Sequence, residues 1–443
     1  MRGSVRRAFV AAAVAGVVPI LATAAAGPRL DPVSVTPDGS AFVNGACYEA
    51  SISNNGRFVA FHTAATDAVA DDGNGRSDVF VRDRRAGVTE SVSVASDGSQ
   101  GDGNSYYGLL SGNGRWVLFN SDAGNLVAGD DNGSRDLFLH DRMTGETRRV
   151  SVAADGTQAD APCYVYGASL SGSGRFATFN SSATTLTDAG SAGHSQVFVV
   201  DLQTGEVTLV SADPDGLPGD AGSYDPSFSS NGRFVAFYSA ASNLVADSSN
   251  EMYQVYVYDL RKRVMRRASV SSDGTLGDGG SYDPVVSNNG QVVAFYSEAT
   301  NLIAADTNAR TDTFVHDFRT GETRRISQME DGTEVVAEGY EPAITASGRT
   351  VLFYTGPGAG YVPEDTNGEG DTYSFDLKTG ALRLVSVNDD GAVGDRRYSW
   401  LWAASMTPTG RWLALTSDAS NFSSLPSPSG GDYRYQVFVL DPR

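Results

Sequence analysis

The sequence has few of the residues on which common catalytic sites are built. Its 443 residues include two cysteines, four histidines and six methionines. It contains no Gly-x-Ser-x-Gly elbow, no His-Glu-x-x-His motif and no suggestive pairing of cysteine with histidine. These absences favour a protein that is not an enzyme, and we predict no catalytic residue.

Basic residues are also scarce. The chain carries 33 lysines and arginines against 53 acids, a formal net charge of −20. Nucleic acids and anionic membranes are bound through basic patches, so neither is expected as a partner. A cation, a basic protein or a neutral glycan remains possible.

Long apolar runs are absent except at the N-terminus. There Arg2, Arg6 and Arg7 precede the apolar stretch 8–21 and small residues at 22–26. This pattern predicts a signal peptide over 1–26. General secretion is favoured over the twin-arginine route, because Val5 stands where that signal usually has Ser or Thr. We expect 27–443 to be a single monomeric domain with no transmembrane segment, secreted, periplasmic or on the cell surface.

One sequence unit recurs seven times. A turn glycine, followed in six cases by arginine, begins an apolar run at intervals of 58 to 62 residues, at Gly56, Gly114, Gly174, Gly232, Gly290, Gly348 and Gly410. In the fourth unit four β-like runs cover 225–229, 234–238, 254–259 and 264–270, and we name them A, B, C and D. Seven such units predict an all-β protein, a seven-bladed β-propeller with four antiparallel strands per blade.

The two ends of the chain are expected to join in the last blade and so close the ring of blades. The last unit stops after its strand C at 437–441, and 32–36 matches the end of strand D in the other units. We therefore predict that an N-terminal strand at about 32–36 completes blade 7 and removes the exposed edges.

The repeated pattern S-x-S-x-x-G-R-F-V-A-F, D-V-F-V-x-D, T-G-E-T, V-S resembles the WD40-like repeats of TolB-type propellers, over essentially all of the mature chain. The resemblance implies the propeller fold and export. It says less about function, since such blades occur in binding proteins and in enzymes. This chain departs from the family pattern by having Asn-Asn-Gly, Gly-Asn-Gly or Pro-Thr-Gly where Pro-Asp-Gly is usual, and by lacking a separate α/β domain before the propeller.

The start of strand A offers a candidate ligand site. An aromatic residue stands eight positions before each turn glycine, at Tyr48, Tyr106, Tyr166, Tyr224, Tyr282, Tyr340 and Trp402. Its parity with core residues four positions later favours packing between blades over a sugar-stacking ring. The next position is acidic in four blades and is expected to face the other way. With Trp400, these acids form a candidate site for a cationic or sugar ligand at the channel mouth: Glu49, Asp225, Asp283 and Glu341.

A second candidate lies in the B to C loops, where four blades carry Asp-x-Asn-x-x-x-Asp. The residues are Asp72, Asn74 and Asp78; Asp130, Asn132 and Asp136; Asp306, Asn308 and Asp312; and Asp365, Asn367 and Asp371. Such oxygens could hold calcium, which takes six to eight ligands, although three side chains fall short of that number. Local turns closed by Asp and Asn are the favoured interpretation.

Other repeated residues have structural explanations. The aspartate that ends strand C, such as Asp83, is expected to pair with the arginine that starts strand B, such as Arg57. His140 and His316 share a position that tolerates many residue types, which suggests exposure. Cys47 and Cys163 lie two repeats apart at matching points, too far for a disulfide, so two buried thiols are expected.

Three functions follow from these patterns. The favoured one is an exported binding or scaffolding propeller that engages an envelope or extracellular protein or glycan through its acidic, loop-rich face. The alternatives are a carbohydrate-active enzyme that uses carboxylates at the mouth, and a calcium-stabilised structural protein of the cell surface.

Overall fold

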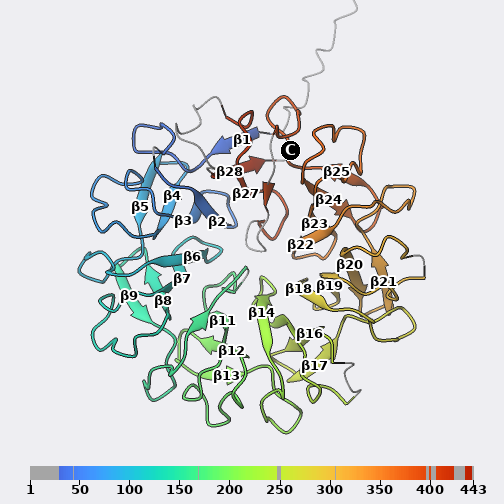
Figure 1. The fold of residues 1–443 in the computed structure, drawn as a ribbon. Helices are drawn as coiled ribbons and strands as arrows, with labels where there is room; N and C mark the ends of the chain where they lie inside the picture. Colours follow the sequence, from blue (N-terminus) through green and yellow to red (C-terminus); the bar gives the residue numbers. More distant parts are fainter. Residues whose placement is uncertain are drawn as a thin grey trace, which may run out of the picture.

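The computed structural model describes residues 29–42, 44–167, 169–246, 251–304, 306–395, 399–400, 406–423 and 435–441. The described part of the chain forms 28 short β-strands and no α-helix, in seven four-stranded antiparallel sheets (Figure 1). None of its segments is a helix long and apolar enough to cross a membrane. The predicted signal peptide, 1–26, lies outside the described residues.

Each sheet is one blade, and its strands follow one another in the order A to D. Blades 1 to 3 consist of β2 (Cys47–Ile52), β3 (Phe58–Thr63), β4 (Asp78–Asp83) and β5 (Val88–Ser91); β6 (Ser105–Leu110), β7 (Trp116–Ser121), β8 (Asp136–Asp141) and β9 (Glu146–Arg149); and β10 (Cys163–Tyr164), β11 (Phe176–Ser181), β12 (Gln196–Asp201) and β13 (Val207–Leu209). Strand A lies nearest the centre of the ring and strand D at its outer rim (Figure 1).

The remaining blades repeat this arrangement. Blades 4 to 6 consist of β14 (Ser223–Phe228), β15 (Phe234–Ser239), β16 (Gln254–Asp259) and β17 (Val264–Arg267); β18 (Ser281–Val286), β19 (Val292–Ser297), β20 (Asp312–Asp317) and β21 (Glu322–Arg325); and β22 (Gly339–Ile344), β23 (Thr350–Thr355), β24 (Thr372–Asp376) and β25 (Leu382–Leu384). Blade 7 contains β26 (Ser399–Trp400), β27 (Leu413–Ser417), β28 (Gln436–Asp441) and, from the other end of the chain, β1 (Arg29–Pro32).

Strand β1 closes the ring, but it lies earlier than predicted. It pairs antiparallel with β28, from Arg29 opposite Asp441 to Pro32 opposite Phe438. Residues 33–36 match segments that follow strand D in the other blades, such as 92–95 after β5, so the predicted range 32–36 is about three residues too late. Val33 still donates a backbone hydrogen bond to the carbonyl of Val437 (2.8 Å).

The core lies between blades. Ala60 and Val79 of blade 1 belong to one buried cluster with Val117 and Phe119 of blade 2. Within that cluster Phe119 stacks on Phe138 with ring centroids 5.8 Å apart. Burying such a side chain contributes about 1.5–3 kcal/mol. Because each blade supplies only part of a cluster, the blades stabilise one another.

The A to B turns are tied together around the channel. Backbone and asparagine hydrogen bonds of 2.7–2.9 Å link blade 1 to blade 2 and so on to blade 7, through Asn54, Gly112, Gly172, Ser230, Asn231, Asn288, Ala346 and Pro408. We call these eight residues the amide ring. A Cβ on Gly112 would lie 2.4 Å from the side chain of Asn54 and 2.8 Å from the carbonyl oxygen of Gly172, so this close approach requires glycine.

The predicted arginine–aspartate pairs are confirmed and are structural. Arg57 pairs with Asp83 at 2.6 Å, and the same pair recurs at Arg115–Asp141, Arg175–Asp201, Arg233–Asp259, Arg349–Asp376 and, at 4.0 Å, Arg411–Asp441. The hydrogen bond from Arg57 lowers the pKa of Asp83 to about 2.

The cysteine prediction is confirmed, whereas the histidine prediction is wrong. Cys47 and Cys163 are buried free thiols. His140 and His316 are buried too, and each Nδ1 lies 2.8 Å from a threonine Oγ1 of the neighbouring strand D, Thr147 or Thr323. The position tolerates varied residues because each packs against strand D, not because it faces solvent.

Candidate functional site

The residue that follows the aromatic position of strand A has an unusual backbone conformation. Its φ is positive in blades 1 to 6, at Glu49 (56°), Tyr107 (55°), Gly167 (41°), Asp225 (45°), Asp283 (45°) and Glu341 (45°). Only one of the six is glycine. A left-handed residue other than glycine costs on the order of 1–3 kcal/mol, and such strain clusters at functional sites. The repetition marks this layer of the channel as a candidate site.

The same residues introduce a β-bulge into strand A. In blade 1 the register shifts between Tyr48 and Ser51, and equivalent shifts occur in blades 2, 4, 5 and 6. The extra residue reverses the alternation, so Tyr48 does not share a face with Ile52, and the parity argument made from the sequence is wrong.

The aromatic side chains pack between blades nonetheless. The rings of Tyr238 and Tyr282 lie 5.3 Å apart, and those of Tyr296 and Tyr340 lie 5.6 Å apart, each pair joining neighbouring blades. Tyr48 remains 39% exposed. The mouth is therefore lined by partly accessible tyrosines. Trp402 lies outside the described residues.

We call Glu49, Asp225, Asp283 and Glu341 the acidic ring. Glu49 lies beside His62, with Oε2 3.2 Å from Nδ1 and side chains 13% and 10% exposed. Burial raises the pKa of Glu49 to about 8, against a hydrogen bond from Tyr107, and lowers the pKa of His62 to about 4. At neutral pH the pair is therefore a protonated acid beside a neutral imidazole.

The other three acids are perturbed in the same direction. Asp225 and Asp283 share a hydrogen bond, and burial raises the pKa of both, that of Asp283 most, so Asp283 keeps the proton. Tyr238 also donates a hydrogen bond to Asp225. Burial raises the pKa of Glu341 to about 8, and its buried Oε2 accepts no hydrogen bond.

The four acids form one electrostatic unit. The charge of Glu341 raises the pKa of both Glu49 and Asp283. Among the described residues, no basic side chain contributes to any of the four shifts. Two arginines near the mouth form ion pairs with acids outside the acidic ring. Arg135 lies 2.8 Å from Asp122, and Arg310 lies 3.7 Å from Glu338.

A pocket opens beside this ring, between blades 5 and 6. Its volume is about 330 Å³, and its lining includes Asp283, Glu341, Glu338, Tyr296, Tyr340 and Tyr354. Carboxylates and tyrosine faces both attract cations. The backbone of Trp400 belongs to β26, and its side chain lies outside the described part.

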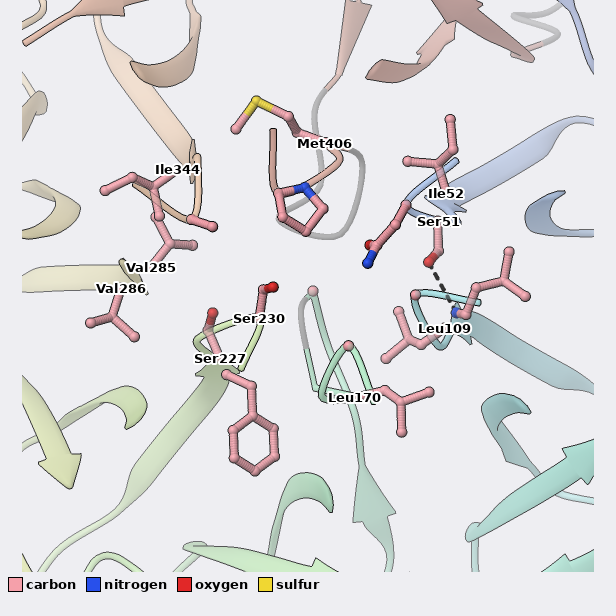
Figure 2. A pocket seen from close by; sticks show the side chains of 18 residues that line it. Ser51, Ile52, Leu109, Leu170, Ser227, Ser230, Val285, Val286, Ile344 and Met406 are labelled. Carbon is pink, nitrogen blue, oxygen red and sulfur yellow. Dashed lines mark hydrogen bonds between the residues drawn. The ribbon is translucent and has the colours of Figure 1, made fainter. Parts of the chain in front are cut away.

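The opposite end of the channel has a different chemistry. Figure 2 shows apolar and serine side chains from all seven blades around a hollow of about 90 Å³, among them Ser51, Leu109, Leu170, Ser227, Val285, Ile344 and Met406. Ser51 Oγ accepts a hydrogen bond from the amide of Leu110 in the next blade (3.0 Å). No charged side chain lines this pocket, so the described acids of the channel gather at the mouth.

The four B to C loops share one local design. In each, the asparagine donates a hydrogen bond of 2.8–3.0 Å to the last aspartate, Asn74 to Asp78, Asn132 to Asp136, Asn308 to Asp312 and Asn367 to Asp371. The asparagine Oδ1 also accepts from the amide two residues on, as in the 2.8 Å bond from Arg76 to Asn74. These are the turns that the sequence favoured.

The first aspartate of these loops meets partners that the sequence did not reveal. Arg149 lies 2.9 Å from Asp130 and 3.5 Å from Asp136. In blade 5, Asp306, Asp312 and Glu334 are the only described acids clustered tightly enough to hold a metal, and Arg325 already lies among them. In the sequence, the Glu-Thr-Arg-Arg segments of blades 2 and 5 were the signal from which these arginine partners could have been predicted.

Comparisons with known proteins show the fold. No family model matches the sequence, and no curated protein matches it. An oligogalacturonate lyase in complex with manganese is similar in structure, with a TM-score of 0.54, 14% identity, and coverage of 95% of this chain and 99% of that one. The oligogalacturonate lyase of Vibrio parahaemolyticus gives a TM-score of 0.52, 12% identity, and coverage of 94% and 98%.

Other similar structures include a propeller domain of a protease and a putative TolB. The open-velcro propeller domain of the Pyrococcus furiosus trilobed protease gives a TM-score of 0.51, 10% identity, and coverage of 90% and 94%. Unlike that domain, this chain pairs β1 with β28. A putative TolB from Agrobacterium tumefaciens gives 0.40 at 16% identity, covering 68% and 84%. At these identities the likeness concerns the fold alone.

Proposed function

We propose that this protein is an exported, non-catalytic binding propeller that captures a cationic group of its partner at the acidic ring. The observation that supports this most is the uncompensated burial of four carboxyl groups at equivalent positions of one channel layer. Buried acids are normally paired with a base or a metal. A bound cation would supply that partner and displace the protons.

The tyrosines of the mouth favour an organic cation. The pocket beside Asp283 and Glu341 offers three tyrosine rings together with carboxylates. Ammonium and guanidinium groups bind such surfaces through cation–π attraction and charge-assisted hydrogen bonds. A lysine or arginine side chain of an envelope or extracellular protein has the required chemistry. The export sequence predicted at 1–26 would bring the chain, which we expect to be a monomer, to such a partner.

An acidic polymer is the wrong ligand for this site. Two similar structures are oligogalacturonate lyases by name, and oligogalacturonate carries carboxylates for which the described acids of the ring offer no positive charge. A neutral glycan could stack on the tyrosines but would leave the acids without a counter-charge. We therefore place a basic protein segment ahead of a glycan.

The test compares a tetralysine peptide with a neutral oligosaccharide in calorimetric titrations. We expect the peptide to bind with proton release, and more tightly at about pH 9 than at about pH 6, because its charge competes with protons for the ring. Glu341→Gln should weaken binding at least about tenfold. The matched control Glu146→Gln, at an exposed position of a C to D turn, should leave it unchanged.

Two results would reject the proposal. One is the absence of peptide binding at both pH values. The other is equal weakening of peptide binding by Glu341→Gln and by Glu146→Gln. That result would mean that the loss of binding follows from the change in net charge and not from the acidic ring. If the protein binds the oligosaccharide and not the peptide, and Glu341→Gln abolishes that binding, the mouth would be a glycan-binding site.

A carbohydrate-active enzyme is the second candidate, and one observation favours it. Burial raises the pKa of Asp225 and of Asp283 at the mouth, and a raised pKa is what the general acid of a glycosidase needs. Turnover should then appear on a panel of neutral polysaccharides and be lost in Asp283→Asn. Turnover that persists in Asp283→Asn and in Asp225→Asn would remove these residues from the reaction.

A further inference from the structure

The junctions between blades contain an internal arginine on the face of the A to B and C to D turns. Between blades 1 and 2 this residue is Arg142, whose guanidinium carbon lies 4.2 Å from the ring centroid of Phe58. The same guanidinium group donates a hydrogen bond to the carbonyl oxygen of Gly114 and forms an ion pair with Glu90. An aromatic ring, a turn carbonyl and a carboxylate thus make up one guanidinium site.

Other junctions are filled in a similar way. Between blades 7 and 1, Arg84 makes the equivalent contacts with Trp412, Gly56 and Asp31. In blades 2, 4 and 5 the arginine comes from strand D and donates a hydrogen bond to a carbonyl of the next blade, and Arg383 has the same register in blade 6. These bonds are Arg148 to Leu202 (2.6 Å), Arg266 to Gly290 (2.6 Å) and Arg324 to Leu377 (2.7 Å).

The junction between blades 3 and 4 is the only one of the seven whose sequence has arginine at neither position. Thr208 stands at the strand D position, and Leu260 follows strand C of blade 4. A groove of about 390 Å³ opens there, and its lining includes Phe176, Asp201, Glu206, Thr208, Gly232 and Leu260. The groove between blades 5 and 6 is of similar size, about 430 Å³, because Val292 replaces the aromatic ring, yet Arg324 lines it.

The aromatic part of the guanidinium site is present in this groove. Phe176 is the first residue of its strand B, as Phe58 is in blade 1. Two guanidinium groups lie over the ring of Phe58, those of Arg57 at 4.7 Å and of Arg142 at 4.2 Å. Among the described residues only Arg175 lies over Phe176, at 4.8 Å. One of the two cation contacts is therefore missing.

The carbonyl and the carboxylate are present as well. Gly232, the turn glycine of blade 4, is buried, and no described residue donates a hydrogen bond to its carbonyl oxygen. Such a carbonyl normally has a partner. Asp201 is already paired with Arg175 at 2.7 Å. Glu206 is exposed and forms no ion pair within the described part of the chain, so its charge is available to a ligand.

Two arginines line the groove without filling it. Arg233 forms the ion pair with the aspartate at the end of its own strand C, at 2.7 Å. Arg261 is exposed. At the position of Arg261, three filled junctions also carry a cation, namely Arg85, Arg319 or Lys378. A positive charge there is therefore compatible with a guanidinium group in the groove.

We propose that the groove between blades 3 and 4 binds the guanidinium group of an arginine side chain that a partner protein presents. The face of Phe176, the carbonyl oxygen of Gly232 and the charge of Glu206 would hold it as the filled junctions hold their own arginines. Lysine fits less well, because its ammonium group is neither planar nor forked. The groove lies on the face of the A to B turns and shares no residue with the acidic ring, so it does not depend on the function proposed for that ring.

The experiment fills the groove from within the protein. Binding of N-acetylarginine amide and of N-acetyllysine amide to the full-length protein is measured by saturation-transfer NMR titration. We expect the arginine probe to bind at least about threefold more tightly than the lysine probe. Thr208→Arg places in blade 3 the residue that blades 2, 4 and 5 carry, so it should fold as they do. It should weaken binding of the arginine probe at least about tenfold.

Two further variants complete the design. Val88→Arg is the matched control, because it adds the same charge at an exposed strand D position beside the junction that Arg142 already fills, and it should leave binding unchanged. Phe176→Leu keeps an apolar side chain but removes the ring, so it should weaken binding of the arginine probe at least about threefold.

Three results would overturn the proposal. The first is the absence of binding of the arginine probe, and the second is equal binding of the two probes. The third is arginine binding that Thr208→Arg and Phe176→Leu leave unchanged, or that Val88→Arg weakens as much as Thr208→Arg does. Binding of tetralysine at the acidic ring should persist in Thr208→Arg, so failure of the groove and failure of the ring are separate outcomes.

Discussion

Neutralising one member of the acidic ring should change the pH dependence of folding. Glu341→Gln replaces a buried carboxyl by a neutral group of the same shape. The pKa of Glu341 is about 8 in the folded protein, against an ordinary value of 4.5 for a glutamate. Between these values the folded state binds more protons than the unfolded state, so stability falls as pH rises from 4.5 to about 8. The glutamine variant has no such loss.

The shift sets the expected size of the effect. At face value it corresponds to about 5 kcal/mol, an upper bound because water and neighbouring side chains can relax around the charge. Below about pH 5 the variant should match the unmodified protein to within about 1 kcal/mol, since glutamine mimics the protonated acid. At about pH 9 the variant should be the more stable of the two by about 2–5 kcal/mol.

Urea denaturation at several pH values measures this difference. Glu146→Gln, at an exposed position far from the ring, is the control and should follow the unmodified protein throughout. A constant difference between Glu341→Gln and the unmodified protein from about pH 5 to about pH 9 would refute the assignment of Glu341 as a buried, protonated acid. Lower stability of the variant at high pH would refute it as well.

Three further predictions concern the scaffold. Gly112→Ala should destabilise the protein by about 1–3 kcal/mol in urea denaturation, because its Cβ would lie 2.8 Å from the carbonyl oxygen of Gly172; an unchanged midpoint would contradict the close packing. Arg325→Met should cost about 3–5 kcal/mol by leaving three clustered carboxyl groups unpaired, and excess calcium should restore part of the melting temperature; stability equal to that of the unmodified protein would argue against a buried ion pair. Deletion of 29–32 exposes an edge of β28, so we expect a lower melting temperature and concentration-dependent association in light scattering, and a monomer of normal stability would contradict closure by β1.

The propeller could be predicted from the sequence because its information is repeated seven times. Turn glycines, β-like runs and pairs such as Arg57–Asp83 recur once in every repeat. A wrong assignment in one repeat is therefore exposed by comparison with the others. The closing strand was misplaced by about three residues, because Val33 and its equivalents follow strand D and resemble strand residues. Its existence was still predictable from the missing strand of the last unit.

The candidate sites were predictable only in part. The acids of the ring were found from position alone, but their left-handed backbone and burial were not, since alternation assumes that strand A contains no bulge at residues such as Asp225. The partners Arg149 and Tyr373 were missed for another reason. Arg149 lies 13 residues from Asp136 and 19 from Asp130, and Tyr373, whose hydroxyl donates a hydrogen bond to Asp365, lies 8 residues from it, so only the folded loop brings these partners together.

The amide ring gives the molecule two mechanically different ends. At the A to B turns, hydrogen bonds tie each blade to the next, from Asn54 in blade 1 to Pro408 in blade 7. At the mouth the blades meet through acids that repel one another once they lose protons. Any widening that follows from this repulsion would therefore begin at the mouth and not at the A to B turns. A ligand that removes the repulsion at the mouth would let the strands that carry the four acids, in blades 1, 4, 5 and 6, approach one another there.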